Sequence, residues 1–321
     1  MNSLFEHVTA AFNAVHGWLF QTAIEPFLFR FDGSDIMEQA YTGTEFFLLG
    51  ALQIIVLYAL LRPLEAWLPA ERWSDRRAVR VDVIYTFIHR LGLFSLAVFF
   101  ILDPLFDSLT GWLRLRGVSG FNLDDLWPGV TSIPLVAFAL YLIVLDFANY
   151  WLHRWQHRYP WWWALHSLHH SQRQMSLWSD DRNHLLDDLL KDAFFALVAI
   201  AIGVPPGQFI LLVVVAKSLE SLQHANLRVS FGRIGERLLV SPRFHRRHHA
   251  IGDGHEGIHR GCNFAVLFPV WDRLFRTADF RPGFPATGVR DQLPVADSPG
   301  RDYGRGFWAQ QWLGLRRMIA G

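Results

Sequence analysis

The sequence predicts an all-helical membrane protein, in which a few membrane helices carry a helical cap on the cytoplasmic side. Three observations lead to this prediction. Hydrophobic residues make up 51% of the 321-residue chain, charged residues make up only 18%, and the chain contains several long apolar segments. An ordinary soluble domain has about 25% charged residues, and a membrane-spanning helix needs about 20 mainly apolar residues. The alternative is a soluble protein whose apolar helices are buried in its core.

The apolar segments give the order of the predicted elements. Residues 1–45 are expected to form an amphipathic segment on the membrane surface, and residues 46–130 to contain the first two spans and their connections. Prolines and glycines interrupt a further apolar stretch between Gly203 and Gly207, which favours a hairpin that dips into the membrane over a straight helix. The three expected spans and this hairpin run roughly over Phe46–Leu61, Val83–Leu102, Ile133–Ala148 and Ala193–Ala216.

The charges of the connections predict the orientation. Residues 62–80 contain five arginines, whereas residues 103–130 contain two arginines and four aspartates. Short loops rich in Arg and Lys face the cytoplasm. The first connection is therefore cytoplasmic, and three spans place everything after residue 150 on the same side. The protein is expected to be a multi-pass integral membrane protein.

Composition also excludes several classes of function. Cys262 is the only cysteine, so a disulfide framework, a cysteine-rich zinc site and an iron–sulfur cluster are excluded. The net charge of about +1 gives no reason to expect a nucleic-acid partner. The chain lacks a dinucleotide-binding glycine fingerprint and a haem-attachment motif.

Three histidine clusters follow the third expected span. Their spacings are His-x3-His, His-x2-His-His and again His-x2-His-His, and five of the fifteen histidines lie within residues 153–170. Residues at i, i+3 and i+4 share one face of a helix. Clustered imidazoles would repel one another if protonated, and a bound metal removes this repulsion by requiring the neutral form. The clusters consist of His153 and His157, of His166, His169 and His170, and of His245, His248 and His249.

Two single histidines, His184 and His224, lie where the chain enters and leaves the apolar hairpin, so both can reach the same pocket. Eight to ten histidines exceed the ligands of one metal ion and suit two. Imidazole binds Zn, Cu, Fe and Ni. Carboxylate-bridged di-iron bundles use two Glu-x-x-His pairs, and the sequence has this spacing once, at Glu256 and His259. His255, Glu256 and His259 also match the His-Glu-x-x-His spacing of metalloproteases, but Gly254 and Gly257 disfavour the helix that this motif requires.

The order of these motifs resembles the fatty acid hydroxylase and sterol desaturase superfamily. The resemblance covers roughly residues 135–278 and includes the surroundings of the histidines, such as Ser241-Pro-Arg-Phe-His245, Asn263-Phe264 and Trp271-Asp-Arg-Leu-Phe275. It implies a catalytic domain over residues 131–278, followed by an interfacial tail over residues 279–321.

The resemblance further implies an oxidoreductase with a non-haem di-iron centre, which activates O2 to hydroxylate or desaturate an unactivated C–H bond of a lipid. Zinc can occupy such a site in purified protein. No catalytic residue beyond the metal ligands and no site for an organic cofactor is expected. Asp187 and Asn226 are candidates to orient ligand histidines by hydrogen-bonding to the ring nitrogen that does not bind the metal. The implied ligands are His153, His157, His166, His169, His170, His184, His224, His245, His248 and His249.

The expected partners are a lipid substrate that enters from the bilayer, O2 and a separate electron donor on the cytoplasmic side. Two other functions use the same histidines: a zinc-dependent membrane hydrolase and a non-catalytic metal-binding membrane protein. Paired carboxylates are missing from the motifs. This weighs against the hydrolase, because attack by metal-bound water usually employs a Glu or Asp base.

Overall fold

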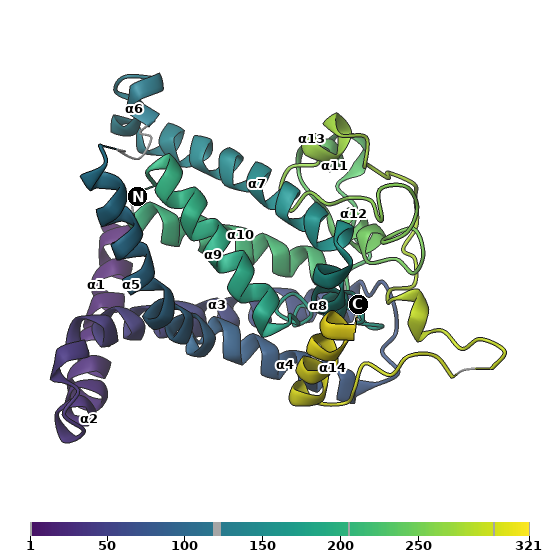
Figure 1. The fold of residues 1–321 in the computed structure, drawn as a ribbon, viewed down its shortest axis with the longest axis horizontal. Coiled ribbons are helices and arrows are strands. Elements are labelled where there is room, and N and C mark those ends of the chain that lie inside the picture. Colours follow the sequence, from purple (N-terminus) through teal and green to yellow (C-terminus); the bar gives the residue numbers. More distant parts are fainter. Residues whose placement is uncertain (1, 118–122, 205, 298, 321) are drawn as a thin grey trace.

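A computed structural model describes residues 2–117, 123–204, 206–297 and 299–320. The regular elements within these ranges are helices (Figure 1). Extended pairing in the described residues is limited to two isolated bridges, Pro69 with Leu227 and Ala250 with Thr287. The prediction of an all-α fold is therefore confirmed.

The N-terminal segment is helical. Helix α1 (Asn2–Leu19) continues through a π-helical turn (Phe20–Ile24) into α2 (Glu25–Arg30), and a 3-10 turn (Ser34–Ile36) leads to the long helix α3 (Met37–Trp67). Helices α1 and α2 expose large apolar side chains, among them Trp18, Phe27 and Phe29. Exposed apolar side chains on short helices suit contact with a membrane surface, which stays a prediction for this segment.

Residues 83–102 were expected to form the second span. This prediction is wrong, because the segment is divided between two helices. Helix α4 (Arg76–Arg90) ends before Gly92, and α5 (Leu93–Leu115) begins after it. Gly92 has a φ of 75°, a left-handed conformation that glycine adopts without steric cost. The last residue of α4, Arg90, is buried and donates hydrogen bonds to Asp180 and Asp181. This end therefore packs inside the protein.

Among the described residues, two helices are long and apolar enough to cross a membrane, judged by length and composition. They comprise Ser34–Trp67 and Pro134–Arg158, which contain the first and third expected spans. They support a membrane protein. The number of membrane crossings and the cytoplasmic orientation stay predictions.

The centre of the molecule is built by four helices that carry most of the site. Helix α7 (Pro134–Arg158) and α8 (Pro160–His170) are separated by Tyr159, and each begins with proline, which suits the first turn of a helix. Helices α9 (Leu185–Ile202) and α10 (Pro206–His224) lie at the two arms of the expected hairpin, whose dip into the membrane stays a prediction. Helix α7 contacts α8, α9 and α10 (Figure 1).

The C-terminal part consists of loops and short helices, followed by a final helix that packs on α8 and α4. The final helix, α14, buries Phe307, Gln310 and Gln311 and exposes Trp308 and Trp312. The interfacial role predicted for the tail stays a prediction, and it can concern only the exposed face of α14. The remaining elements are α6 (Leu123–Leu126), α11 (Gly232–Leu238), α12 (Pro242–His248), α13 (Val270–Leu274), α14 (Phe307–Ala320) and 3-10 turns at Val130–Ser132 and Arg290–Gln292.

Candidate metal centre

Nine of the ten predicted ligand histidines meet in one buried region, where the ends of four helices converge (Figure 1). Each of the nine is at most 7% exposed. The i, i+3 and i+4 spacings act as expected, since they turn the rings of one helix to the same side. Helix α7 provides His153 and His157, α8 provides His166, His169 and His170, α10 provides His224, and α12 with its C-cap provides His245, His248 and His249.

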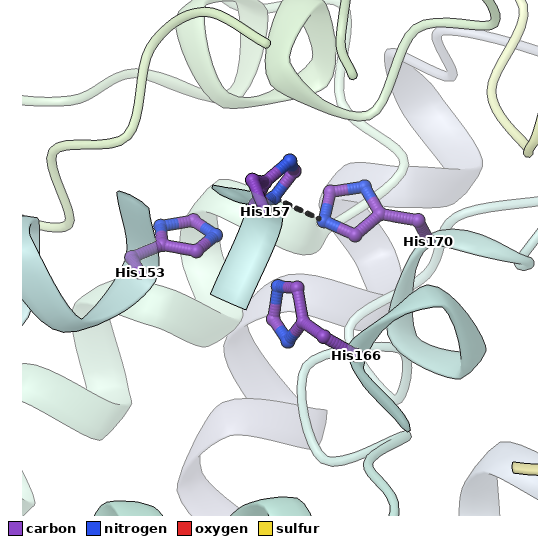
Figure 2. A group of neighbouring side chains, drawn as sticks. All are labelled: His153, His157, His166 and His170. Carbon is purple, nitrogen blue, oxygen red and sulfur yellow. Dashed lines mark hydrogen bonds between the residues drawn. The ribbon is translucent and has the colours of Figure 1, made fainter. Parts of the chain in front are cut away.

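The nine histidines form two groups of four, joined by a third group. His153, His157, His166 and His170 point toward one another, and their potential ligand atoms lie within 4.8 Å of one another (Figure 2). A third group of His170, His248 and His249 shares a member with each of the others. The second group of four comprises His169, His224, His245 and His249.

Short contacts between ring nitrogens run through both groups. The Nε2 atoms of His157 and His170 are 3.1 Å apart. In the second group, the Nε2 atom of His224 lies 3.1 Å from that of His169 and 3.0 Å from that of His245. Ligands bound to one metal at about 2.1 Å lie about 3.0 to 3.4 Å from their neighbours. The observed separations match this spacing.

A loop of backbone carbonyls fixes three of the rings. The Nδ1 atom of His153 donates to the oxygen of Phe264 at 2.8 Å, and that of His248 donates to Cys262 at 2.7 Å. The Nδ1 atom of His157 donates to Arg260 at 3.2 Å. Asp272 supports this loop by accepting hydrogen bonds from the backbone nitrogens of Phe264 and Ala265, both at 2.8 Å. A proton on Nδ1 leaves the Nε2 lone pair free for a metal ion.

Asp187 holds a fourth ring. Its Oδ2 atom lies 2.9 Å from the Nδ1 atom of His166, while Gln156 and Trp162 donate to Oδ1 at 2.8 and 2.7 Å. Asp187 therefore orients His166 on α8, as the prediction of an orienting role for this residue requires. The Nδ1 atom of His224 donates to the backbone oxygen of Glu220 at 2.8 Å.

The electrostatics of the site favour neutral imidazoles. Burial, and then the proximity of other histidines, lowers the pKa of His169, His170, His245, His248 and His249 well below the ordinary value. The Nε2 atoms of His166 and His248 are buried and have no hydrogen-bond partner in the described part of the chain. Neutral, converging imidazoles with unpartnered nitrogens are a donor set that fits metal ions.

The structure does not bring His184 to this region, so its assignment as a ligand is corrected. Its Nδ1 atom accepts a hydrogen bond from the backbone of Leu186 at 3.1 Å and caps the start of α9. Its Nε2 atom donates to the oxygen of Gln311 at 2.8 Å. The ring lies against Gly314, where a Cβ atom would come within 2.4 Å of the His184 Cδ2 atom. The Nδ1 atom therefore caps α9, while the Nε2 atom joins this helix start to α14.

Asn226 also lies apart from the histidine rings. Its side chain accepts a hydrogen bond from the backbone nitrogen of Glu71 at 3.0 Å and donates to the oxygen of Glu71 at 2.8 Å. The residue therefore fastens the end of the α10 segment to the connection between α3 and α4. Its predicted orienting role is corrected accordingly.

A cavity of about 460 Å³ adjoins the histidines. Leu142 of α7, Phe195 of α9 and Leu212 of α10 contribute to its apolar wall, and His166 and His224 are among the histidines that line it. Further charged residues of α4, α9 and α10 also line the cavity, among them Arg90, Lys191 and Lys217, and sequence reasoning did not assign these three to a site. Their position within apolar segments was the available signal, since buried charges in such segments usually have a function.

The three consecutive tryptophans after α7 have separate environments, and none of them lines the cavity. The exposed ring of Trp161 stacks on Trp162 with a centroid distance of 5.0 Å. Trp162 binds Asp187, and Trp163 packs against His157 with a centroid distance of 4.9 Å. Two of the three therefore support the histidine region from behind.

Comparisons with known proteins agree with this geometry. The fatty acid hydroxylase family matches residues 138–277. Ornithine lipid hydroxylase OlsE of Rhizobium tropici is 25% identical over 265 residues, which cover 82% of this chain and 72% of that protein. Alkylglycerol monooxygenase of Homo sapiens is 28% identical over 136 residues, or 41% of this chain and 28% of that protein. No solved structure matches. These matches support the fatty acid hydroxylase and sterol desaturase superfamily, with the family model confined to residues 138–277.

Proposed function

We propose that this protein is a membrane monooxygenase with two iron ions, which hydroxylates an unactivated C–H bond of a lipid. The observation that carries the proposal is the pair of four-histidine groups beside a cavity with apolar walls. The reaction consumes one lipid C–H bond, O2, two electrons and two protons, and yields the alcohol and water. The similarity to lipid hydroxylases and monooxygenases supports hydroxylation over desaturation.

Each group of four histidines would hold one metal ion. His248, which lies with one member of each group, would be a ninth ligand. Imidazole nitrogens bind both iron and zinc, but zinc has no redox chemistry. We propose iron because oxygen insertion requires a metal that changes oxidation state. When bound, the two ions would activate O2 next to the lipid.

The chain's own residues have three tasks in this proposal. The carbonyls of Arg260, Cys262 and Phe264, together with Asp187, hold rings with their metal-binding nitrogens turned inward. The apolar wall accepts the lipid chain and excludes water from the reacting carbon. A separate donor supplies the electrons, and we place its docking site, like the metal centre, on the cytoplasmic face of a multi-pass protein.

The test combines metal analysis with isotope labelling. Protein purified without added zinc is expected to contain about two iron ions per chain, as the ligand count requires. Cells that express the gene under ¹⁸O2 are expected to accumulate a lipid that is heavier by one labelled oxygen atom. The same cells with His169→Ala should lack it.

Two results would contradict the proposal. Full activity with zinc and no O2 uptake would indicate a hydrolase instead. Loss of two hydrogens from the lipid, without gain of oxygen, would indicate a desaturase.

A further inference from the structure

A group of polar residues on one side of the cavity is not explained by metal binding. Asp188 and Asp192 of α9 both line the cavity, and so does His89 of α4. The two aspartates are one helical turn apart, and like charges at i and i+4 destabilise a helix. Asp188 is buried. Such a pair requires a cation to balance it.

The cationic side chains that line the cavity are already engaged. Arg90 donates to Asp180 and Asp181. Lys217 lies 3.3 Å from Glu220 and 3.6 Å from Asp181. Lys191 lies 3.0 Å from the Oδ1 atom of Asp188. The three cations already contact four carboxylates. The negative charge of Asp192 and the second oxygen of Asp188 are therefore left without a cation in the part of the chain that the structure describes.

Two buried atoms in this group have no hydrogen-bond partner among the described residues. They are the Oδ2 atom of Asp188 and the Nε2 atom of His89. They lie 3.4 Å apart, so a protonated His89 would pair with Asp188, but burial lowers the pKa of His89 and favours its neutral form. A buried carboxylate oxygen without a donor is costly. The arrangement therefore lacks an N–H donor that carries positive charge.

We propose that Asp188 and Asp192 bind the ammonium group of a lipid with a primary amine in its headgroup. An ammonium has three N–H donors. The Oδ2 atom of Asp188, a carboxylate oxygen of Asp192 and the Nε2 atom of His89 are its three acceptors. The apolar wall of the same cavity, with Phe195 and Leu212, receives the lipid chain. The headgroup thereby lies beside Asp187, the residue that holds His166.

A metal ion is a poorer occupant of this position. The side-chain atoms of His89, Asp188 and Asp192 are not among the groups of the described chain that converge within 4.8 Å, whereas those of the nine histidines are. Charged N–H···O contacts are about 2.7 to 2.9 Å long, against about 2.1 Å for a metal–nitrogen bond, so an ammonium spans wider acceptors. Lys191, which contacts Asp188, repels a doubly charged metal ion about twice as strongly as a singly charged ammonium.

The experiment measures binding and does not require turnover. Full-length protein without metal is placed in phosphatidylcholine nanodiscs, and dodecylammonium and dodecanol are titrated as matched probes. The wild type is expected to bind dodecylammonium about tenfold more tightly than dodecanol, as one charge-assisted contact provides. Asp188→Asn should abolish this preference and leave dodecanol binding unchanged. Asp297→Asn, an exposed aspartate of the C-terminal loop, is the control and should retain the preference.

Equal binding of the two probes by the wild type would overturn the proposal. A preference that survives both Asp188→Asn and Asp192→Asn would overturn it too. Asp192→Asn also supplies the test if Asp188→Asn does not fold. The proposal rests on the proposed function, since it names the lipid that the oxygenase accepts. The two fail separately, because amine preference without oxygenation refutes only the function, and oxygenation without preference refutes only the ammonium site.

Discussion

The two four-histidine groups are assembled in different ways. The group of His153, His157, His166 and His170 comes from 18 consecutive residues of α7 and α8. The group of His169, His224, His245 and His249 comes from three helices that are far apart in the sequence. The first group is therefore largely set by local helical spacing, and the second depends on how α8, α10 and α12 pack.

The groups also differ in how firmly their rings are held. In the first group, the Nδ1 atoms of His153, His157 and His166 are bound by Phe264, Arg260 and Asp187. In the second group, the Nδ1 atoms of His169, His245 and His249 have no hydrogen-bond partner among the described residues. Fixed rings bind metal more tightly because less ordering is needed. We therefore expect the first group to bind its metal ion more tightly than the second.

The largest expected effect comes from removing one ligand of either group. His166→Ala should lose the metal ion of the first group, and His224→Ala that of the second, so each variant retains about one of two ions. Hydroxylation should fall by more than about 100-fold in both, since loss of a ligand exceeds the effect of losing its support. Metal content by mass spectrometry and ¹⁸O incorporation check this.

Titration of apoprotein with Fe(II) sharpens the comparison. The wild type should show two binding steps. His224→Ala should retain the tighter step, and His166→Ala the weaker one. Simultaneous loss of both ions in either variant would mean that the groups do not act as separate sites.

The predictability of the two groups follows from the same difference. Spacing alone indicated the faces of α7, α8 and α12, because histidines at i, i+3 and i+4 must share a side of a helix. A single histidine has no such internal check. The assignments of His224 and His184 as ligands both rested on resemblance. His224, at the end of α10, lies among the other histidines, whereas His184 contacts Gln311 and Gly314 of α14. That contact joins residues 127 positions apart.

Other features could not be read from local sequence for related reasons. The carbonyls that hold His153, His157 and His248 are backbone atoms, which every residue possesses, so only the loop's path selects them. The apolar composition of residues 83–102 resembled a span. The distant aspartates that bind Arg90 and the left-handed Gly92 make it two helices instead.

A smaller effect is expected from loosening a ring of the first group without removing a ligand. Asp187→Asn keeps the shape of the side chain but removes the charge that faces His166 and two other donors. Metal affinity of the first group should fall by about 10- to 100-fold, as is typical for partners of ligating histidines. Fe(II) titration should show the tighter step moving toward the weaker one. A shift confined to the weaker step would mean that Asp187 supports the other group.

The smallest effect on the centre should come from His184, the histidine that the structure places outside both groups. His184→Ala removes the cap of α9 and the bond to Gln311, and loss of a helix cap lowers the free energy of unfolding by about 1 kcal/mol. The melting temperature should fall, while the variant should still bind two metal ions. His184→Asn restores a capping side chain and should recover part of the stability. Loss of one metal ion in His184→Ala, with the melting temperature of the apoprotein unchanged, would instead make His184 a ligand and contradict the contacts with α14.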